Sequence, residues 1–551
     1  MVHELKKVLT LRDLILFGVG GTVGAGIFVS IGVGAVQSGP ALFLSFLLAA
    51  SACTISGLCF CEMASRVPTS GSSYSYTFFV LGEFPAFLIG SVLVLDSIIS
   101  AAACARAWSS YVVVVLPFLP TYLSHIDVIP HILSISILSA FVCAALGVVL
   151  FFGIKETTTF NNISTCLNIL VLSVFVLAGL PLADSANWTP FAPAGLGGIV
   201  RGAGRIFFAY LGFEVVNCLA EETEGDHRTA KKLVPRAILW TIAISTTVYV
   251  FVAVSFVGLV PLVDINISSP LSSAFTYRGF TSLAYIVGIG AVGNTLTSVL
   301  SNFLVQPRIV LRMASDGFLP ARLAKIDHRG VPRMALFVSV SASSVTALLV
   351  DFETLADMVS VASLISLSTV CVCSIIARIR NATFGPISRS ETADAEEVVS
   401  LSETNAIRIS DFSSPLGLFF KFLIAYICSC AAASAYLLHS ADVGVVGATL
   451  LSFSLVLFLA TCISFSRNSA EAIKAESLFL VPLSPGLPLL GIFINTYLLF
   501  GLPPLALVRA LCVFGTASVY YWFKLRNRNS AGFVFQKDDP QEEFGVEVIA
   551  K

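Results

Sequence analysis

Long apolar stretches separated by short polar ones repeat along almost the whole of the 551-residue chain. A run of about 18 or more apolar residues is long enough to cross a bilayer as a helix. The pattern therefore predicts an all-α polytopic membrane protein with about fourteen transmembrane helices. The spans are expected at roughly 14–36, 41–61, 76–115, 132–152, 161–180, 199–220, 237–260, 281–307, 334–350, 355–377, 418–438, 442–465, 487–502 and 505–523.

The first apolar stretch contains a glycine cluster, Gly18-Val-Gly-Gly-Thr-Val-Gly-Ala-Gly-Ile27. Each glycine inside a helix costs about 1 kcal/mol relative to alanine. We therefore expect this membrane helix to break near its centre. Backbone that leaves a helix at membrane depth is tolerated only where protein or a water-filled cavity covers it, so the break should line a site.

A second glycine cluster, Gly202, Gly204 and Gly212, lies in the sixth span and is followed by Glu214. The first and sixth spans each open a block of five, as expected of inverted repeats whose broken helices meet at the bilayer midplane. A half-helix N-terminus attracts an anion, and freed carbonyls attract a cation, so the pair predicts a site for a zwitterion. The alternative is that the glycines only allow close helix packing. The predicted contacts are Gly24, Ala25, Gly26 and Ile27 for a carboxylate, and Phe207, Phe208 and Tyr210 for an ammonium group.

The polar segments divide the chain. The insert after Arg378 is rich in serine and acidic residues and cannot bury enough apolar surface to order itself, which predicts a cytoplasmic linker. Lysine and arginine concentrate in alternate loops, which predicts that both termini are cytoplasmic. The expected parts are an N-terminus (1–13), two five-helix repeats (14–180 and 199–378), the linker (379–416), four additional helices (417–524) and a C-terminal tail (525–551).

Composition excludes several classes of function. No basic tract indicates a nucleic-acid partner, and the 13 cysteines lie mostly in apolar runs, where free cysteine behaves as a small hydrophobe. No metal cluster, cofactor loop or nucleophile–base pair is recognisable, so neither an enzyme nor a cofactor or metal is expected. Two sequons, at Asn187 and Asn266, fall in loops predicted to lie on the non-cytoplasmic side and are glycosylation candidates.

Several motifs resemble those of the cationic amino acid transporters of the amino acid-polyamine-organocation (APC) superfamily. They are Phe17–Phe28, Cys61–Tyr76, Leu81–Phe87, Ala105–Ser109, Gly153–Glu156, Phe207–Glu214 with Glu221-Glu222, and Pro485–Leu498. The resemblance implies a LeuT-like five-plus-five core with four further spans, and an amino acid as substrate. Related exchangers carry a cysteine between spans three and four for a heavy chain; the segment Pro117–His131 has none, so no disulfide-linked heavy chain is expected.

Two acids fall inside predicted spans, Asp96 and Glu214. An ionisable group within a span is a functional candidate because exposing it to lipid is unfavourable, and a buried charge must be paired. Either acid could face a cationic substrate side chain or serve coupling, and either could instead be a structural partner. Arg106, also within a span, is expected to pair internally.

Asn168 bears on whether transport is coupled to protons. By the family resemblance, some bacterial relatives have a lysine at this point, whose ammonium is thought to occupy the place of a sodium ion. An amide cannot take up a proton at physiological pH, which puts lysine-mediated proton coupling in doubt. Facilitated diffusion, or coupling through Asp96 or Glu214, is the interpretation that follows.

Charged residues gather at the predicted cytoplasmic ends of the spans. They could form a gating network that closes the inner vestibule, or they could be ordinary interface charges. The gating candidates are Glu62, Arg66, Lys155, Glu156, Glu221 and Glu222.

Together these observations predict a secondary transporter that moves amino acids, above all cationic ones such as arginine and lysine, by alternating access. The alternatives are a transporter of neutral amino acids or polyamines, and an amino-acid sensor that binds without transport. The resemblance is compatible with the plasma membrane and with a vacuolar or lysosomal membrane.

Overall fold

The computed structural model describes residues 9–66, 72–129, 133–151, 158–214, 216, 227–325, 332–384, 415–439, 444–469 and 479–525. These residues are mainly helical, apart from one antiparallel hairpin of β1 (Ile126–Ile129) and β2 (Leu133–Ile135). Within the described residues, nine helices are long and apolar enough to cross a membrane. The helical, membrane-spanning class is confirmed, and the number of about fourteen spans stays a prediction.

The first predicted span consists of two helices, α1 (Leu11–Thr22) and α2 (Ala25–Ser38). A capping box begins α1: Thr10 Oγ1 accepts from the Asp13 N–H at 3.4 Å, and the Thr10 N–H donates to the Asp13 carboxylate at 3.1 Å. The chain leaves the helix at Val23 and Gly24, and no side chain caps the first turn of α2. The break predicted from the glycine cluster is therefore confirmed.

The rest of the first block comprises α3 (Leu42–Arg66), α4 (Ser72–Leu81), α5 (Glu83–Val115), α6 (Ile137–Phe151) and α7 (Thr158–Gly179). The single span predicted at 76–115 is in fact two helices. Gly82, with φ at 93°, turns the chain between α4 and α5 in a conformation that favours glycine.

The second block begins with α8 (Gly195–Ile206), which ends in a 3₁₀ turn, η5 (Phe207–Tyr210), and an irregular turn as far as Glu214. The second predicted break is also confirmed. Then follow α10 (His227–Leu259), α11 (Pro270–Tyr277), α12 (Thr281–Ser315), α13 (Arg333–Leu349) and α14 (Phe352–Phe384). A short helix precedes a long one at the third place of both blocks, as α4 and α5 and as α11 and α12.

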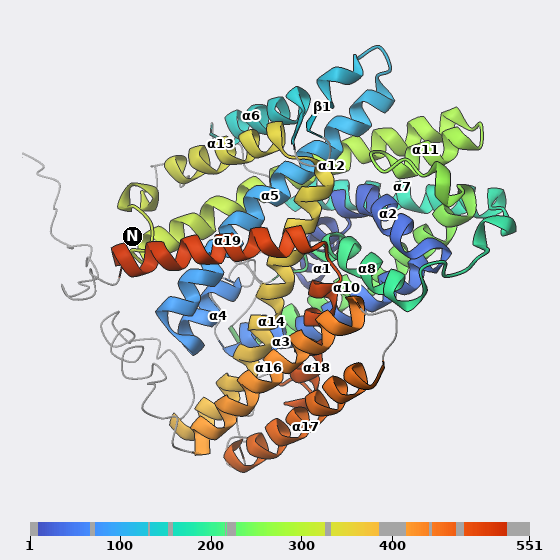
Figure 1. The fold of residues 1–551 in the computed structure, drawn as a ribbon. Coiled ribbons are helices and arrows are strands. Elements are labelled where there is room, and N and C mark those ends of the chain that lie inside the picture. Colours follow the sequence, from blue (N-terminus) through green and yellow to red (C-terminus); the bar gives the residue numbers. More distant parts are fainter. Residues whose placement is uncertain are drawn as a thin grey trace, which may run out of the picture.

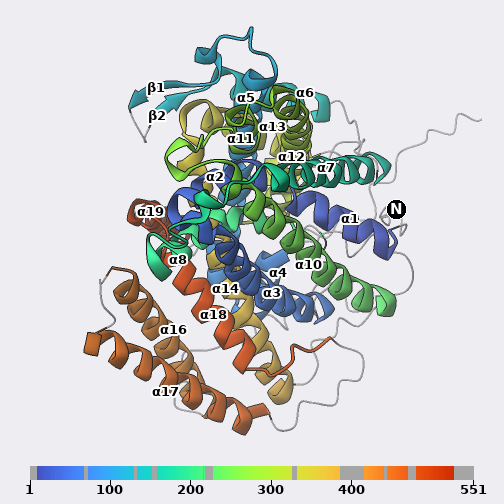
Figure 2. The ribbon, with the colours of Figure 1, turned by 90° about the vertical axis from the view of Figure 1, so that its right-hand side faces the viewer.

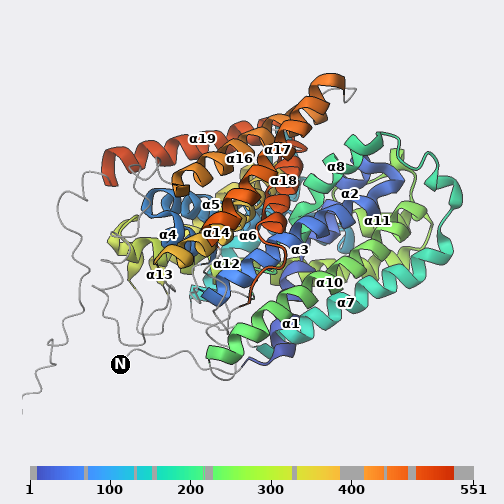
Figure 3. The ribbon, with the colours of Figure 1, turned by 90° about the horizontal axis from the view of Figure 1, so that it is seen from below.

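The C-terminal helices are α16 (Pro415–His439), α17 (Gly444–Ser469), α18 (Gly486–Phe500) and α19 (Pro504–Tyr520). The pair α16 and α17 lies side by side at the periphery (Figures 1 and 2), and α18 packs on α14 and α3. Figure 3 shows α19 along one edge of the molecule. The described residues also form short 3₁₀ or π turns: η1 (Gly39–Ala41), η2 (Thr121–Leu123), η3 (Leu180–Leu182), η4 (Ser185–Trp188), η7 (Leu262–Asp264), η8 (Ala321–Ala324) and η10 (Tyr521–Leu525).

Arg106 pairs internally, as predicted. Its guanidinium donates to the carbonyls of Ala347 (2.6 Å) and Leu348 (3.0 Å) at the C-terminal end of α13, and to the carbonyl and hydroxyl of Ser134 in β2. A cation at this end of a helix satisfies carbonyls that have no partner in the helix itself. Arg106 is therefore a structural residue that joins α5, α13 and the hairpin.

Candidate functional site

The two broken helices touch each other through their backbones. A Cβ at position 26 would overlap the Ala209 Cα and lie 3.1 Å from the Ala209 Cβ, and a Cβ at position 21 would lie 3.2 Å from the Gly212 carbonyl oxygen. Gly212 also has φ at 124°, which side-chain-bearing residues rarely adopt. The glycines therefore do both things considered above: they break the helices and they let the breaks approach closely.

Peptide carbonyls freed by the breaks find partners on neighbouring helices. The Tyr249 hydroxyl, on α10, lies 2.6 Å from the Thr22 carbonyl oxygen and 2.8 Å from that of Ala209, so one side chain joins both breaks. The Val23 carbonyl accepts a hydrogen bond from the Asn294 amide of α12 at 3.0 Å. These contacts stabilise irregular backbone at the centre of an apolar protein, where an unpaired carbonyl is costly.

A cavity of about 160 Å³ lies beside the breaks. Of the predicted site residues, the structure brings six into its lining, from both breaks and from α5 and α7. They are Gly24, Gly26, Asp96, Asn168, Phe208 and Glu214. The side chains of Ile27, Phe207 and Tyr210 are buried in the core and do not line this cavity, and the side chain of Ala25 lies outside what the structure describes.

The lining combines apolar surface with hydroxyl, amide and two carboxylic acid side chains. Asp96 enters from α5 and Glu214 from the turn after η5, and the Ser363 hydroxyl of α14 contacts Asp96 at 3.5 Å. Among the described residues that line the cavity, none is a lysine, arginine or histidine. A small cavity with two carboxylic acids and no basic side chain is chemically suited to a cationic ligand.

One helix contributes lining residues that the sequence analysis missed. Thr297, Ser298, Ser301 and Asn302 of α12 face the cavity, and Asn294 lies one turn before them against the first break. These polar residues recur at the spacing of one helix face. That stripe within an otherwise apolar span is the signal from which they could have been found.

Three helices besides the breaks supply most of the cavity lining, through residues 93–104 of α5, 164–168 of α7 and 297–309 of α12. Phe208, which also lines the cavity, contacts the Phe352 ring of α14 with centroids 6.4 Å apart. Next to them, Arg205 of α8 forms an ion pair with Glu353 and lies 3.7 Å from Asp357, both on α14. We call these three residues the Arg205 cluster; it ties α8 to α14.

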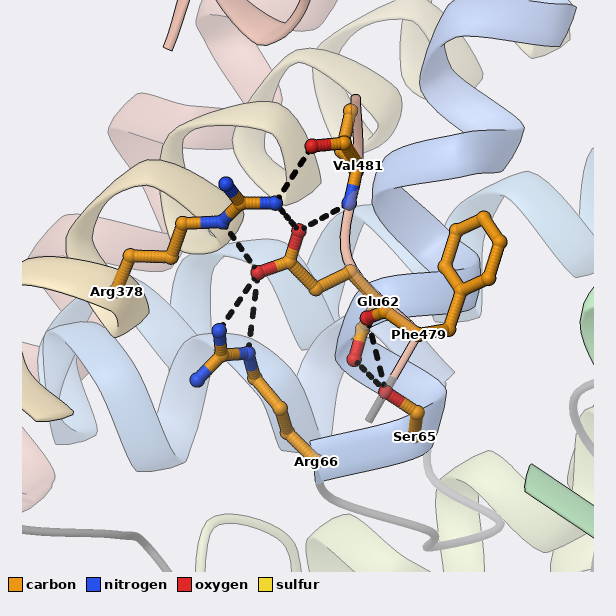
Figure 4. A network of polar contacts seen from close by, with 6 residues as sticks. All are labelled: Glu62, Ser65, Arg66, Arg378, Phe479 and Val481. Carbon is orange, nitrogen blue, oxygen red and sulfur yellow. Dashed lines mark hydrogen bonds and ion pairs between the residues drawn. The ribbon is translucent and has the colours of Figure 1, made fainter. Parts of the chain in front are cut away.

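Of the gating candidates, Glu62 and Arg66 meet in a buried network, shown in Figure 4, and Lys155, Glu156, Glu221 and Glu222 lie outside the described residues. The fully buried Glu62 carboxylate accepts hydrogen bonds from Arg66 (2.7 Å), from Arg378 of α14 (2.7 and 2.5 Å) and from the Val481 N–H (2.9 Å). Burial and pairing distinguish Glu62 from an ordinary interface charge, and a gating role for it stays a prediction. Its network, the Glu62 cluster, joins α3, α14 and the segment before α18.

The two sequons differ in surroundings. The Asn187 amide donates to the Gly258 carbonyl at 2.9 Å. The Asn266 side chain is exposed, and its oxygen accepts from the Ser268 N–H at 2.9 Å. Glycosylation of either residue stays a prediction, with Asn266 the more accessible acceptor.

Apolar membrane-spanning helices around two broken helices and a cavity that holds two acids are the architecture of a membrane transport protein. A family model described as amino acid permease matches residues 9–429, and one described as the C-terminus of AA_permease matches residues 479–528. The chain belongs to the cationic amino acid transporter family of the APC superfamily. It is thus an amino acid transporter of a membrane.

Three relatives illustrate the range of the family. The vacuolar cationic amino acid transporter 4 of Arabidopsis thaliana is 33% identical over 575 residues, covering 96% of this chain and 93% of that protein. The cationic amino acid transporter 4 of Mus musculus is 30% identical, covering 92% and 85%. The branched-chain amino acid permease BcaP of Bacillus subtilis is 34% identical, covering 68% and 82%. Relatives are thus named for both cationic and branched-chain substrates.

Proposed function

We propose that this protein transports cationic amino acids, arginine and lysine, by alternating access. The observation that carries the choice of a cationic substrate is the presence of Asp96 and Glu214 in one small cavity whose described lining has no basic side chain. A buried carboxylate requires a partner, and a substrate ammonium or guanidinium group would supply one.

The α-carboxylate of the substrate is proposed to bind at the start of α2. Gly24, the N-cap residue, offers no side-chain cap, so the first N–H groups of α2 are available to an anion. Gly24 and Gly26 line the cavity, and their lack of a side chain allows an oxygen to approach the backbone. The α-ammonium would lie near the carbonyls of the second break, beside Phe208.

Alternating access is proposed to follow from a five-plus-five repeat like that of LeuT. The broken first member and the short-then-long third member recur in both blocks, which supports the repeat. In the predicted topology, the lining residues of α7 and α12 lie in the cytoplasmic halves of these helices. We therefore assign the described state as inward-facing. Opening to the other side would then require separation of α8 from α14 at the Arg205 cluster.

Uptake of radiolabelled amino acids into proteoliposomes tests the function directly. We expect uptake of lysine and arginine, competition by each other, and weaker competition by leucine. Stronger uptake of leucine would favour a neutral amino acid, and competition by polyamines but not by free lysine would favour a polyamine. Binding of lysine without any uptake would indicate a sensor.

Glu214→Gln is expected to reduce lysine uptake by about tenfold or more while changing leucine uptake less, since a hydrogen bond to a charged group contributes roughly 1.5–3 kcal/mol. The paired measurement is the KM for both substrates in the same proteoliposomes. Asp264→Asn, at an exposed acid in η7, is the matched control and should leave both unchanged. Equal losses for lysine and leucine would mean that Glu214 serves the fold or coupling instead of side-chain recognition.

A further inference from the structure

Two asparagine side chains connect α7 to the first helix break. The Asn168 Nδ2 donates to the Asn294 Oδ1 at 2.5 Å, and the Asn294 Nδ2 donates to the Val23 carbonyl oxygen at 3.0 Å. The side chains are almost completely buried, with 4% of Asn168 and 1% of Asn294 exposed. Burial and short distances make this a fixed contact between two helices and the irregular backbone of a third segment.

The hydrogen bonds of the two amides have a defined donor and acceptor order. A primary amide has an oxygen that only accepts and a nitrogen that only donates. Because Asn168 donates to the Asn294 oxygen, the Asn294 nitrogen is turned toward Val23. An acceptor at position 168 would favour the opposite orientation and place the Asn294 oxygen against the Val23 carbonyl, where two acceptors repel each other.

The Val23 carbonyl immediately precedes Gly24, the residue that begins the anion-binding end of α2. Freed carbonyls of broken membrane helices are commonly satisfied by a bound cation. Here a neutral N–H of Asn294 occupies the direction from which a cation would bind the Val23 oxygen. The adjoining turn of α12 also touches this break, since a Cβ at Gly24 would lie 2.8 Å from the Ser298 hydroxyl.

We propose that Asn294 is a positioning residue that holds the α1–α2 break in its substrate-binding shape, and that Asn168 sets the orientation of the Asn294 amide. The inference rests on the proposed function, because it assumes that the start of α2 receives the substrate carboxylate. It deepens that function by naming two residues that act on the substrate site through the backbone.

The experiment compares the wild-type protein with Asn294→Asp and Asn168→Asp in proteoliposomes, with and without sodium. Wild-type lysine uptake should be the same in sodium and in choline. Asn294→Asp places a carboxylate beside the Val23 carbonyl, so the KM should rise about tenfold, the effect of one lost hydrogen bond. Sodium should then partly restore uptake, because a cation can bridge the two oxygens. Asn168→Asp should raise the KM similarly by reversing the Asn294 amide.

Thr295→Val is the matched control on the same helix. Thr295 is buried next to Asn294, but its hydroxyl bonds carbonyls of its own helix, at Ala291 and Val292. The KM of the Thr295→Val variant for lysine should stay within about twofold of the wild-type value. A merely structural defect in the asparagine variants would lower the amount of folded protein without creating a response to sodium.

Lysine-induced thermal stabilisation in detergent separates this inference from the proposed function. If the wild-type protein shows no uptake but is stabilised by lysine, the proposed transport function is refuted. The same variants then still test the positioning role through lysine binding. Asn294→Asp and Asn168→Asp variants that bind like the wild type in choline would overturn the inference. Should Asn294→Asp not fold, Asn168→Asp decides between the outcomes.

Discussion

Gly26→Val is expected to abolish uptake of every amino acid substrate while the protein still folds and reaches the membrane. The Cβ alone would overlap the Ala209 backbone, and the valine methyl groups would extend further into the second break. The two broken helices would have to separate, and the first N–H groups of α2 would no longer face the cavity at the correct distance. We expect uptake to fall by about 100-fold or more, since small misplacements at a binding site have effects of that order.

Gly293→Val on α12 is the matched control. Gly293 is exposed, and within the described part of the chain no atom beyond the neighbouring backbone of α12 lies within 4 Å of its Cβ position. This variant should retain uptake close to that of the wild type. For both variants, the amount of protein that reaches the membrane should be measured, and its folded state should be checked by size-exclusion chromatography in detergent. Normal uptake by Gly26→Val would refute the binding site between the breaks.

Glu62→Ala is expected to lower the free energy of unfolding strongly. The change leaves the guanidinium groups of Arg66 and Arg378 without their carboxylate in a buried position. Removing one partner from a buried ion pair costs roughly 3–5 kcal/mol, because the other charge stays desolvated. The Val481 N–H would also lose its acceptor. Thermal unfolding of the purified protein in detergent measures the effect.

Glu353→Ala provides the comparison, because Glu353 also pairs with an arginine but its side chain is 30% exposed. Pairs that reach solvent contribute about 0–1 kcal/mol, so this variant should unfold close to the wild-type temperature. Equal and small changes in both variants would show that the Glu62 cluster contributes no more than a surface pair.

The Glu62 cluster also bears on gating. None of Glu62, Arg66 and Arg378 lines the cavity, and the cluster joins α3 and α14 to residues 479–481, where the C-terminal family match begins. We therefore favour an anchor for the C-terminal helices over an inner gate. The Arg205 cluster, next to the ring contact of Phe208 with Phe352, is the better candidate for a contact that opens during transport.

The positions of both breaks could be predicted because their cause is local. Glycine lowers helix stability wherever it lies, so clusters at 18–26 and 202–212 indicated interrupted helices without knowledge of any partner. Asp96 and Glu214 could be chosen for a similar reason, since an acid in an apolar span must have a function or a partner. The structure places both in one cavity.

Partners from distant parts of the chain could not be predicted. Tyr249 bonds carbonyls of both breaks and Asn294 bonds that of Val23. The polar stripe of α12 could have marked Asn294 as a site residue, but no pattern in the sequence names the carbonyl that either side chain contacts. Arg378 looked like one of many arginines at a span end until the structure placed it on Glu62. Such contacts depend on how helices separated by more than 200 residues are oriented around each other.

By itself, the sequence determined that this chain enters a membrane as helices, where two of them break, and which acids are held in the apolar region. These properties follow from hydropathy, from glycine's low helix propensity and from the cost of an unpaired charge, all of which act within a single segment. Only the tertiary structure decided that the breaks touch at Gly26 and Ala209, that the Asn294 amide bonds the Val23 carbonyl, and that Glu62 is buried and paired. Hydrogen bonds and close packing need a partner at a defined distance and angle, and that geometry exists only once the helices have packed.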